Sequence, residues 1–209
     1  IRSTGKHFSA GGDIQRFKKL IDSEEYLNED GIMYAGRMTS AIRRCEKPVI
    51  AMVQGVATGA GCSIAVACDF RVAAPSSKFI MGFVRLGLTG DTGSMYFLYK
   101  LLGIAKATEM LMLGDPVGGE DAYRIGLVNK LVKEEELEAE TYALARRLAD
   151  SPTQSIRLQK RALTEFFYQD LDAYSVRESE YLAQTSRTAD FAEAVNAFLE
   201  KRPPVFSGK

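Results

Sequence analysis

The chain has 209 residues, of which 46% are hydrophobic and 26% are charged, so it is long enough to bury one substantial core. Its 27 basic residues balance 27 acidic ones, and a neutral chain has no overall positive field with which to hold nucleic acid or an anionic membrane surface. No apolar run reaches the roughly 20 residues that cross a bilayer. We therefore expect a soluble protein without nucleic-acid or membrane partners.

The first 93 residues mix glycines with β-branched residues, a pattern typical of alternating strands and helices. Residues 1–4 are strand-like. Residues 32–45 carry apolar and small side chains at helical spacing, and residues 47–53 form a short apolar run that predicts a buried strand. Residues 59–68 predict a helix of small residues whose backbone packs closely against its surroundings.

From Ser94 onward the pattern is mostly helical. A short strand is expected over 127–132, and it separates an α/β core over 1–130 from a helical region over 131–209 that is too thin to fold alone. Capping residues, glycines and prolines predict two helices that end at Gly103 and Gly114, and further helices over 120–126 and 134–150. Another helix is expected after Pro152, with Ile156, Leu163, Phe166 and Phe167 on one face. The last helix is expected over 190–202, before Pro203 and Pro204.

The cysteine and histidine content argues against a disulfide framework and against a metal site. Cys45, Cys62 and Cys68 have neither the even count of a disulfide scaffold nor the paired spacing, with histidines, of a zinc site. His7 is the only histidine. We therefore expect a reducing, cytoplasmic setting and no metal. Because the chain begins at Ile1 inside a strand-like segment, we also expect a further N-terminal piece.

Two glycine turns stand out, "SAGGD" at 9–13 and "ATGAG" at 57–61. Each follows a strand-like segment and opens a helix, so each can present unpaired backbone N–H groups at the positive end of a helix dipole. Two such donors that converge on one oxygen would form an oxyanion hole. From the pattern alone, ordinary tight turns remain the alternative interpretation. The GxGxxG spacing of a dinucleotide site is absent from both.

Together, five segments in order resemble the crotonase (enoyl-CoA hydratase/isomerase) superfamily over essentially the whole chain. The resemblance implies an α/β fold with a ββα spiral core over 1–130, N-terminally incomplete, and a C-terminal helical trimerisation region over 131–209. It also implies a homotrimer or homohexamer that binds an acyl-CoA thioester, with coenzyme A as part of the substrate and no separate cofactor. The segments are "HFSAGGDI", "KPVIAMVQGVATGAGCSIAVACDFRVAA", "SSKFIMGFVRLGLTGDTGS", "GDPVGGEDAYRIGLVNKLV" and "AFLEKRPPVF".

The resemblance assigns the two glycine turns a role. In this family two peptide N–H groups, which match Gly12 and Ala60, bind the thioester oxygen and stabilise an enolate. The positions that the resemblance places around the substrate are Lys6, Phe8, Ser9, Ala10, Gly11, Asp13, Ile14, Gly59, Gly61, Ser63, Phe83, Leu86, Leu88, Phe198 and Lys201.

Members of this family differ in which acidic residues face the thioester. Hydratases carry two glutamates, and Ser63 and Phe83 stand at the matching positions here, which argues against ordinary hydration. Asp91 remains, and its flanks are most similar to the epoxyphenylacetyl-CoA isomerases of the phenylacetate pathway. A carboxylate in an apolar pocket has a raised pKa, which suits a proton shuttle. The alternative is that Asp91 is a helix N-cap.

Other charged residues are expected to have mainly structural roles. We expect Asp69 to be a buried acid with a structural role and Asp13 to cap the helix that it opens. The phosphates of coenzyme A need locally placed positive charge. Besides Lys6 and Lys201, the resemblance points to Lys160 and Arg161, although each could equally be a solvated side chain.

The sequence therefore predicts an acyl-CoA isomerase of fatty-acid or aromatic degradation, in which Gly12 and Ala60 hold the enolate oxygen and Asp91 moves the proton. One alternative is an aryl-CoA hydrolase or dehalogenase in which Asp91 is the nucleophile. Others are an atypical enoyl-CoA hydratase and a relative that binds acyl-CoA or RNA without catalysis, the RNA version being disfavoured by the neutral charge.

Overall fold

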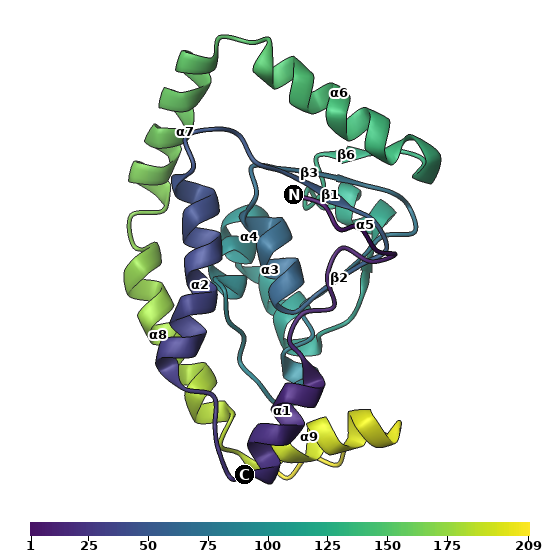
Figure 1. Cartoon of the computed structure of the whole chain (residues 1–209), viewed down its shortest axis with the longest axis vertical. Helices are drawn as coiled ribbons and strands as arrows, with labels where there is room; N and C mark the ends of the chain where they lie inside the picture. The colour runs from purple at the N-terminus through teal and green to yellow at the C-terminus, as the bar shows by residue number, and fades with distance from the viewer.

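Short strands alternate with longer helices along the chain, and the computed structural model describes all of residues 1–209 (Figure 1). In chain order the elements are α1 (Ile14–Asp22), α2 (Glu29–Arg44), β1 (Ile50–Val53), β2 (Val56–Thr58), α3 (Ala60–Ala67), β3 (Phe70–Ala73), β4 (Lys78–Ile80), the 3₁₀ helix η1 (Val84–Leu86), α4 (Ser94–Leu113), β5 (Val117–Gly118), α5 (Gly119–Arg124), β6 (Lys130–Leu131), the 3₁₀ helix η2 (Glu134–Glu136), α6 (Leu137–Ala149), α7 (Thr153–Phe167), α8 (Leu171–Thr185) and α9 (Ala189–Glu200).

The strands form two three-stranded sheets, with the orders β1–β3–β6 and β2–β4–β5. Strands β1 and β3 pair in parallel from Ile50 opposite Phe70 to Val53 opposite Ala73. Strand β2 pairs in parallel with β4, which pairs antiparallel with β5. Gly55, with a φ of 58°, lies between β1 and β2 and passes the chain from one sheet to the other. The α/β class of fold expected from the sequence is confirmed.

Several of the predicted elements are found with shorter bounds. The strand expected over 47–53 is β1, the small-residue helix over 59–68 is α3, and the strand over 127–132 shrinks to β6. Residues 1–4 form no assigned strand, although Ile1 exchanges backbone hydrogen bonds with Ile50 and Met52 beside β1. Within α4, Gly103 leaves helical geometry with a φ of 73°, at the position where a helix end was expected.

Helix α3 is the centre of the core. Six of its eight residues are buried, and α2, α4 and β2 pack against it. Its alanines and Cys62 have short side chains and Gly61 has none, so the neighbouring elements approach its backbone closely. None of the helices combines the length and the apolar character needed to cross a bilayer.

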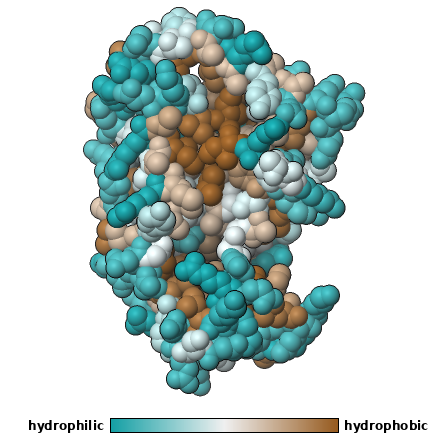
Figure 2. Space-filling view, in the orientation of Figure 1, coloured by the Kyte–Doolittle hydropathy of each residue, from teal (hydrophilic) through white to brown (hydrophobic).

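The C-terminal helices wrap around one side of the core (Figure 1). Helix α2 packs along α8 and also contacts α7. The apolar face predicted after Pro152 lies on α7, and its side chains Leu163, Phe166 and Phe167 are exposed. Figure 2 shows apolar surface in the upper middle of the face that Figure 1 presents. A hollow lined by Pro48, Ile50 and residues of α6 and α7 opens between these two helices and β1.

A buried ion cluster ties α7 to the core and corrects one expectation. Lys160 is only 5% exposed, and its ammonium group donates to Asp69 at 2.7 Å and to the carbonyls of Ile42 and Lys47. Asp69 also pairs with Arg43 at 2.9 Å. The suggestion that Lys160 binds a coenzyme A phosphate is therefore wrong, because its charge is already used inside the protein. The structural role expected for Asp69 is confirmed.

Replacing Asp69 tests this cluster. The Asp69→Ala variant leaves the buried Arg43 and Lys160 without a counter-charge, so we expect the free energy of unfolding to fall by about 3 to 5 kcal/mol. Denaturant unfolding measures the change. The control is Glu46→Ala, which removes the exposed pairs with Arg157 and Arg161 and should leave stability nearly unchanged. Equal effects of both variants would contradict the assignment.

Candidate active site

Backbone hydrogen bonds bring the two glycine turns together. The N–H of Phe8 donates to Gln54 at 2.9 Å and that of Ser9 to Val56 at 3.1 Å, while the N–H of Thr58 donates back to Ser9 at 3.1 Å. Ser9 thus forms a parallel bridge with Ala57 on β2. Because the two segments run in the same direction, the turns that follow them emerge side by side.

Glycine is required where these turns meet. Gly11 has a φ of 78°, and a Cβ atom on it would lie 2.7 Å from the carbonyl oxygen of Thr58. Gly61 packs so closely against the side chain of Ser9 that it also has no room for a Cβ atom. The bare backbone therefore serves first to let the two turns touch.

The N–H groups of Gly12 and Ala60 remain free at this junction. Neither donates to a protein acceptor, whereas the neighbouring N–H of Gly59 donates to Ile80. Ala60 is the first residue of α3, so its N–H lies at the positive end of that helix dipole. Both residues line the same pocket. This is the kind of arrangement that can bind one carbonyl oxygen or anion.

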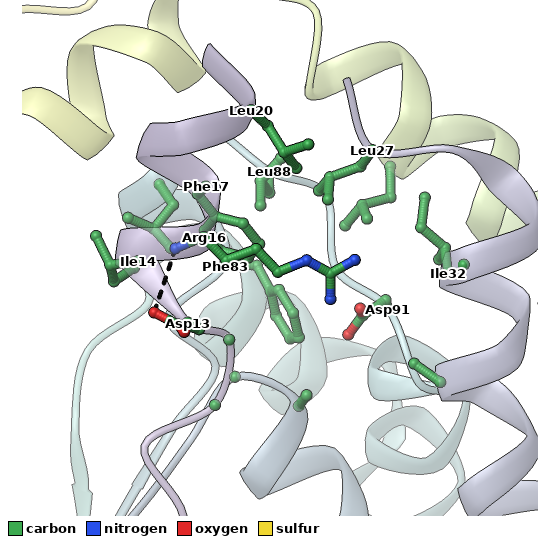
Figure 3. A pocket seen from close by; sticks show the side chains of 18 of the residues that line it. Asp13, Ile14, Arg16, Phe17, Leu20, Leu27, Ile32, Phe83, Leu88 and Asp91 are labelled. Atoms are coloured by element: carbon green, nitrogen blue, oxygen red, sulfur yellow. Dashed lines mark hydrogen bonds between the residues drawn. The ribbon is translucent and has the colours of Figure 1, made fainter. Parts of the chain in front are cut away.

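The pocket is largely apolar and has a volume of about 290 Å³ (Figure 3). Eleven of the residues singled out from the sequence line it: Ala10, Gly11, Gly12, Asp13, Ile14, Gly59, Ala60, Phe83, Leu86, Leu88 and Asp91. Sequence reasoning missed a further set from α1, α2, β2, α8 and the connecting loops: Arg16, Phe17, Leu20, Tyr26, Leu27, Asn28, Gly31, Ile32, Ala35, Thr58, Gly82 and Leu182.

One signal in the sequence could have found part of the missed set. Ile14, Phe17 and Leu20 recur at intervals of three residues, which marks the apolar face of α1. Figure 3 shows this face beside the pocket, and the Arg16 side chain extends across the pocket. Helix α1 is held in place by the edge-to-face contact of Phe17 with Phe191 of α9, whose ring centroids are 5.6 Å apart.

The remaining sequence-predicted residues do not line this pocket. Phe8 is buried in the core, while Ser9 and Gly61 are used in the contact between the turns. Lys6 is exposed, and so are Phe198 and Lys201 at the end of α9. Arg161 is paired with Glu46 at 2.6 Å.

Asp91 faces the pocket from a loop with unusual backbone geometry (Figure 3). Gly90, Thr92 and Gly93 around it have φ values of 121°, 54° and 74°. The N-cap of α4 is Gly93, and Asp91 gives that helix no side-chain cap bond, so the N-cap alternative is not supported. Burial raises the pKa of Asp91 from 3.8 to about 6, and the Thr92 hydroxyl, which donates to Oδ1 at 3.0 Å, partly offsets it.

No acid stands at the two positions where hydratases of the resembled family carry glutamates. Ser63 is fully buried, and its hydroxyl lies 3.3 Å from the carbonyl oxygens of Gly59 and Asp91, to which it can donate. It thereby links the second glycine turn to the Asp91 loop. Phe83 places its ring in the pocket wall.

Asp13 and His7 are engaged within the protein. The Asp13 carboxylate accepts from the N–H groups of Gln15 and Arg16 at 2.9 and 3.3 Å, so the predicted cap of α1 is confirmed. The His7 ring nitrogen Nδ1 accepts from Val56 N–H at 3.2 Å. Asp91 is therefore the acid in the pocket whose carboxylate is not used to cap a helix.

Residues 1–209 match the enoyl-CoA hydratase/isomerase family, and the chain belongs to it. A trans-2-decenoyl-(acyl-carrier-protein) isomerase of Streptococcus mutans serotype c is 33% identical over all of this chain and 80% of its own length. A crotonyl-CoA hydratase of Syntrophomonas wolfei is 38% identical over 99% and 78% of the two chains.

Other relatives show the same mixture of reactions. A 1,2-epoxyphenylacetyl-CoA isomerase of Escherichia coli K12 is 35% identical over all of this chain and 80% of its own. The crystal structure of an enoyl-CoA hydratase from Mycobacterium avium subsp. paratuberculosis superposes with a TM-score of 0.88 at 29% identity, covering 99% of this chain and 78% of that one. The family is thus established, and isomerases and hydratases both occur among the relatives.

The raised pKa of Asp91 predicts a stability change that depends on pH. The folded state binds the proton of the Asp91 carboxyl group more tightly than the unfolded state does. Above about pH 6 the carboxylate is ionised and destabilises the fold, and this destabilisation disappears as the pH falls toward 4. We expect Asp91→Asn to be more stable than the wild type by up to about 3 kcal/mol at pH 8, with a smaller difference at pH 4.5. Denaturant titrations at both pH values measure this; a difference independent of pH would refute it.

Proposed function

We propose that the protein is an acyl-CoA isomerase, which moves a proton between two carbons of an acyl thioester by way of an enolate. The observation that carries this proposal is the pairing of two free peptide N–H groups with one desolvated carboxylate in a single apolar pocket. Family membership supports an acyl-CoA substrate, and two of the relatives named above are isomerases.

The thioester oxygen is proposed to bind between the N–H groups of Gly12 and Ala60. Removing a proton from the carbon next to the thioester places negative charge on this oxygen, and both hydrogen bonds strengthen as that charge develops. The dipole of α3, which begins at Ala60, adds to this stabilisation. The pocket contributes by excluding water, which would compete for the oxygen.

Asp91 is proposed to carry the proton. Its ionised carboxylate takes the proton from one carbon, leaving the electron pair in the enolate, and the resulting carboxylic acid returns the proton to the other carbon. A pKa of about 6 leaves Asp91 largely ionised at neutral pH and makes it a stronger base than an exposed aspartate. The carboxylate ends the cycle as it began.

The acid content of the pocket favours isomerisation over hydration. The hydratases of this family use two glutamates, whereas this pocket contains Asp91 and the capping Asp13. One carboxylate suffices to shuttle one proton. The similarity to a crotonyl-CoA hydratase keeps hydration as the second candidate, and in that case Asp91 would activate water alone.

The remaining features of the proposal concern the acyl group and the assembly. Leu20, Leu27, Leu88 and other apolar side chains of the pocket suit an aliphatic or aromatic acyl group, as in the epoxyphenylacetyl-CoA isomerases. We further propose that residues 131–209 mediate a homotrimer or homohexamer through the exposed apolar face of α7, and that Lys6 and Lys201 assist in holding coenzyme A.

Heavy-water exchange tests the role of Asp91. Incubated in D₂O with a panel of enoyl-, dienoyl- and aryl-CoA thioesters, the wild type should introduce deuterium into at least one acyl chain, and Asp91→Asn should do so about 100- to 10,000-fold more slowly. At pH values below about 6, where Asp91 becomes protonated, the exchange rate of the wild type should decrease. An acyl adduct on Asp91 would indicate displacement instead, and water addition would indicate hydration.

A proline substitution tests the proposed oxyanion hole. Ala60 is the first residue of α3, where proline is well tolerated, so Ala60→Pro removes one N–H donor at a position compatible with the helix. We expect its kcat to fall about 100- to 1,000-fold. Ala60→Ser keeps the N–H and is the matched control. A kcat of Ala60→Pro equal to that of Ala60→Ser would show that this donor is not used.

A further inference from the structure

A second buried carboxyl group lies behind Asp91. Glu178 is on α8 and is 3% exposed. Its Oε2 accepts from the N–H of Gly93 at 2.7 Å, and its Oε1 accepts from the Tyr174 hydroxyl at 3.2 Å and lies 3.5 Å from the Ser94 hydroxyl. Glu178 therefore reaches from the C-terminal helices to the first turn of α4, two residues after Asp91.

The backbone that Glu178 holds is strained. Thr92 is β-branched and fully packed, yet its φ of 54° lies in the left-handed region that such residues avoid. A conformation of this kind persists only where surrounding contacts impose it. Gly93 follows in the same region and provides no side-chain cap for α4, so the Glu178 carboxyl group serves as the cap from a different helix.

The neighbourhood of Glu178 connects this contact to the pocket. Leu182, one turn further along α8, lines the pocket, so one face of α8 contributes both a wall residue and the anchor of the Asp91 loop. Burial, reinforced by the charge of Asp91, raises the pKa of Glu178 to about 7.

We propose that Glu178 is a positioning residue for catalysis, which fixes Asp91 in the pocket by holding the strained Thr92–Gly93 segment through the Gly93 N–H. This inference rests on the proposed function, because it gives Glu178 its role through Asp91. It adds a second residue of α8 to the site, beside the pocket-lining Leu182. Neither the sequence nor the pocket lining singles out Glu178.

Three substitutions at Glu178 separate positioning from simple stability. Glu178→Gln keeps an oxygen for the Gly93 N–H, so we expect kcat within about threefold of the wild type. Glu178→Leu has similar bulk and no acceptor, and Glu178→Asp keeps the charge on a shorter side chain. Both should lower kcat, by about 10- to 100-fold for Leu and less for Asp, with KM within about twofold, because misplaced catalytic groups lose rate rather than substrate binding.

Glu180→Gln on the same helix is the control, since Glu180 is paired with Arg177 at the surface. Circular dichroism and thermal melting establish that each variant is folded. Should Glu178→Leu fail to fold, Glu178→Asp decides the matter. An unchanged kcat in whichever of these two variants is folded, or a kcat of Glu178→Gln as low as theirs, overturns the positioning role.

The comparison with Asp91→Asn keeps the two proposals distinguishable. If Asp91→Asn is inactive while the Glu178 variants are fully active, the positioning role fails and the proposed function stands. If Asp91→Asn retains the wild-type exchange rate, the proposed function itself fails, and the role assigned to Glu178 fails with it.

Discussion

The contact between Gly11 and the carbonyl of Thr58 is the constraint on which the site depends. Without a Cβ atom at Gly11 the two turns can touch, and the parallel bridge between Ser9 and Ala57 fixes their register. One turn then contributes Gly12 and the other Ala60 to the lining of the same pocket. The sheet, the buried helix α3 and the glycines thus act together to place two residues with unpaired N–H groups in the lining of one pocket.

The second requirement is a carboxylate that is costly to ionise. Asp91 lies in an apolar pocket and receives one hydrogen bond, from Thr92, so burial dominates its proton affinity. The burial that suits Asp91 to its proposed role as a base also destabilises the fold at neutral pH. Ser63 contacts the backbone carbonyl of Asp91 and Glu178 holds the N–H of Gly93 two residues later, so the strained Thr92 lies between two anchored positions.

Local patterns predicted the features that depend on local sequence. The apolar run that became β1, the small residues of α3 and the Asp13 cap are each recognisable within a few neighbouring residues. Family resemblance, rather than pattern alone, pointed to Gly12, Ala60 and Asp91. The burial of Lys160 against Asp69 and the contact of Glu178 with Gly93 join residues 91 and 85 positions apart, and no local signal marks such pairs.

The central claim is that a thioester oxygen binds between two peptide N–H groups, and vibrational spectroscopy tests it most directly. A saturated acyl-CoA labelled with ¹³C at the thioester carbon, bound to the wild-type protein, gives an isotope-edited carbonyl band in an infrared difference spectrum. Two converging donors and the α3 dipole polarise the carbonyl, so the account predicts a band at clearly lower frequency than for the same thioester in water. A bound thioester whose band stays at the frequency in water would contradict it.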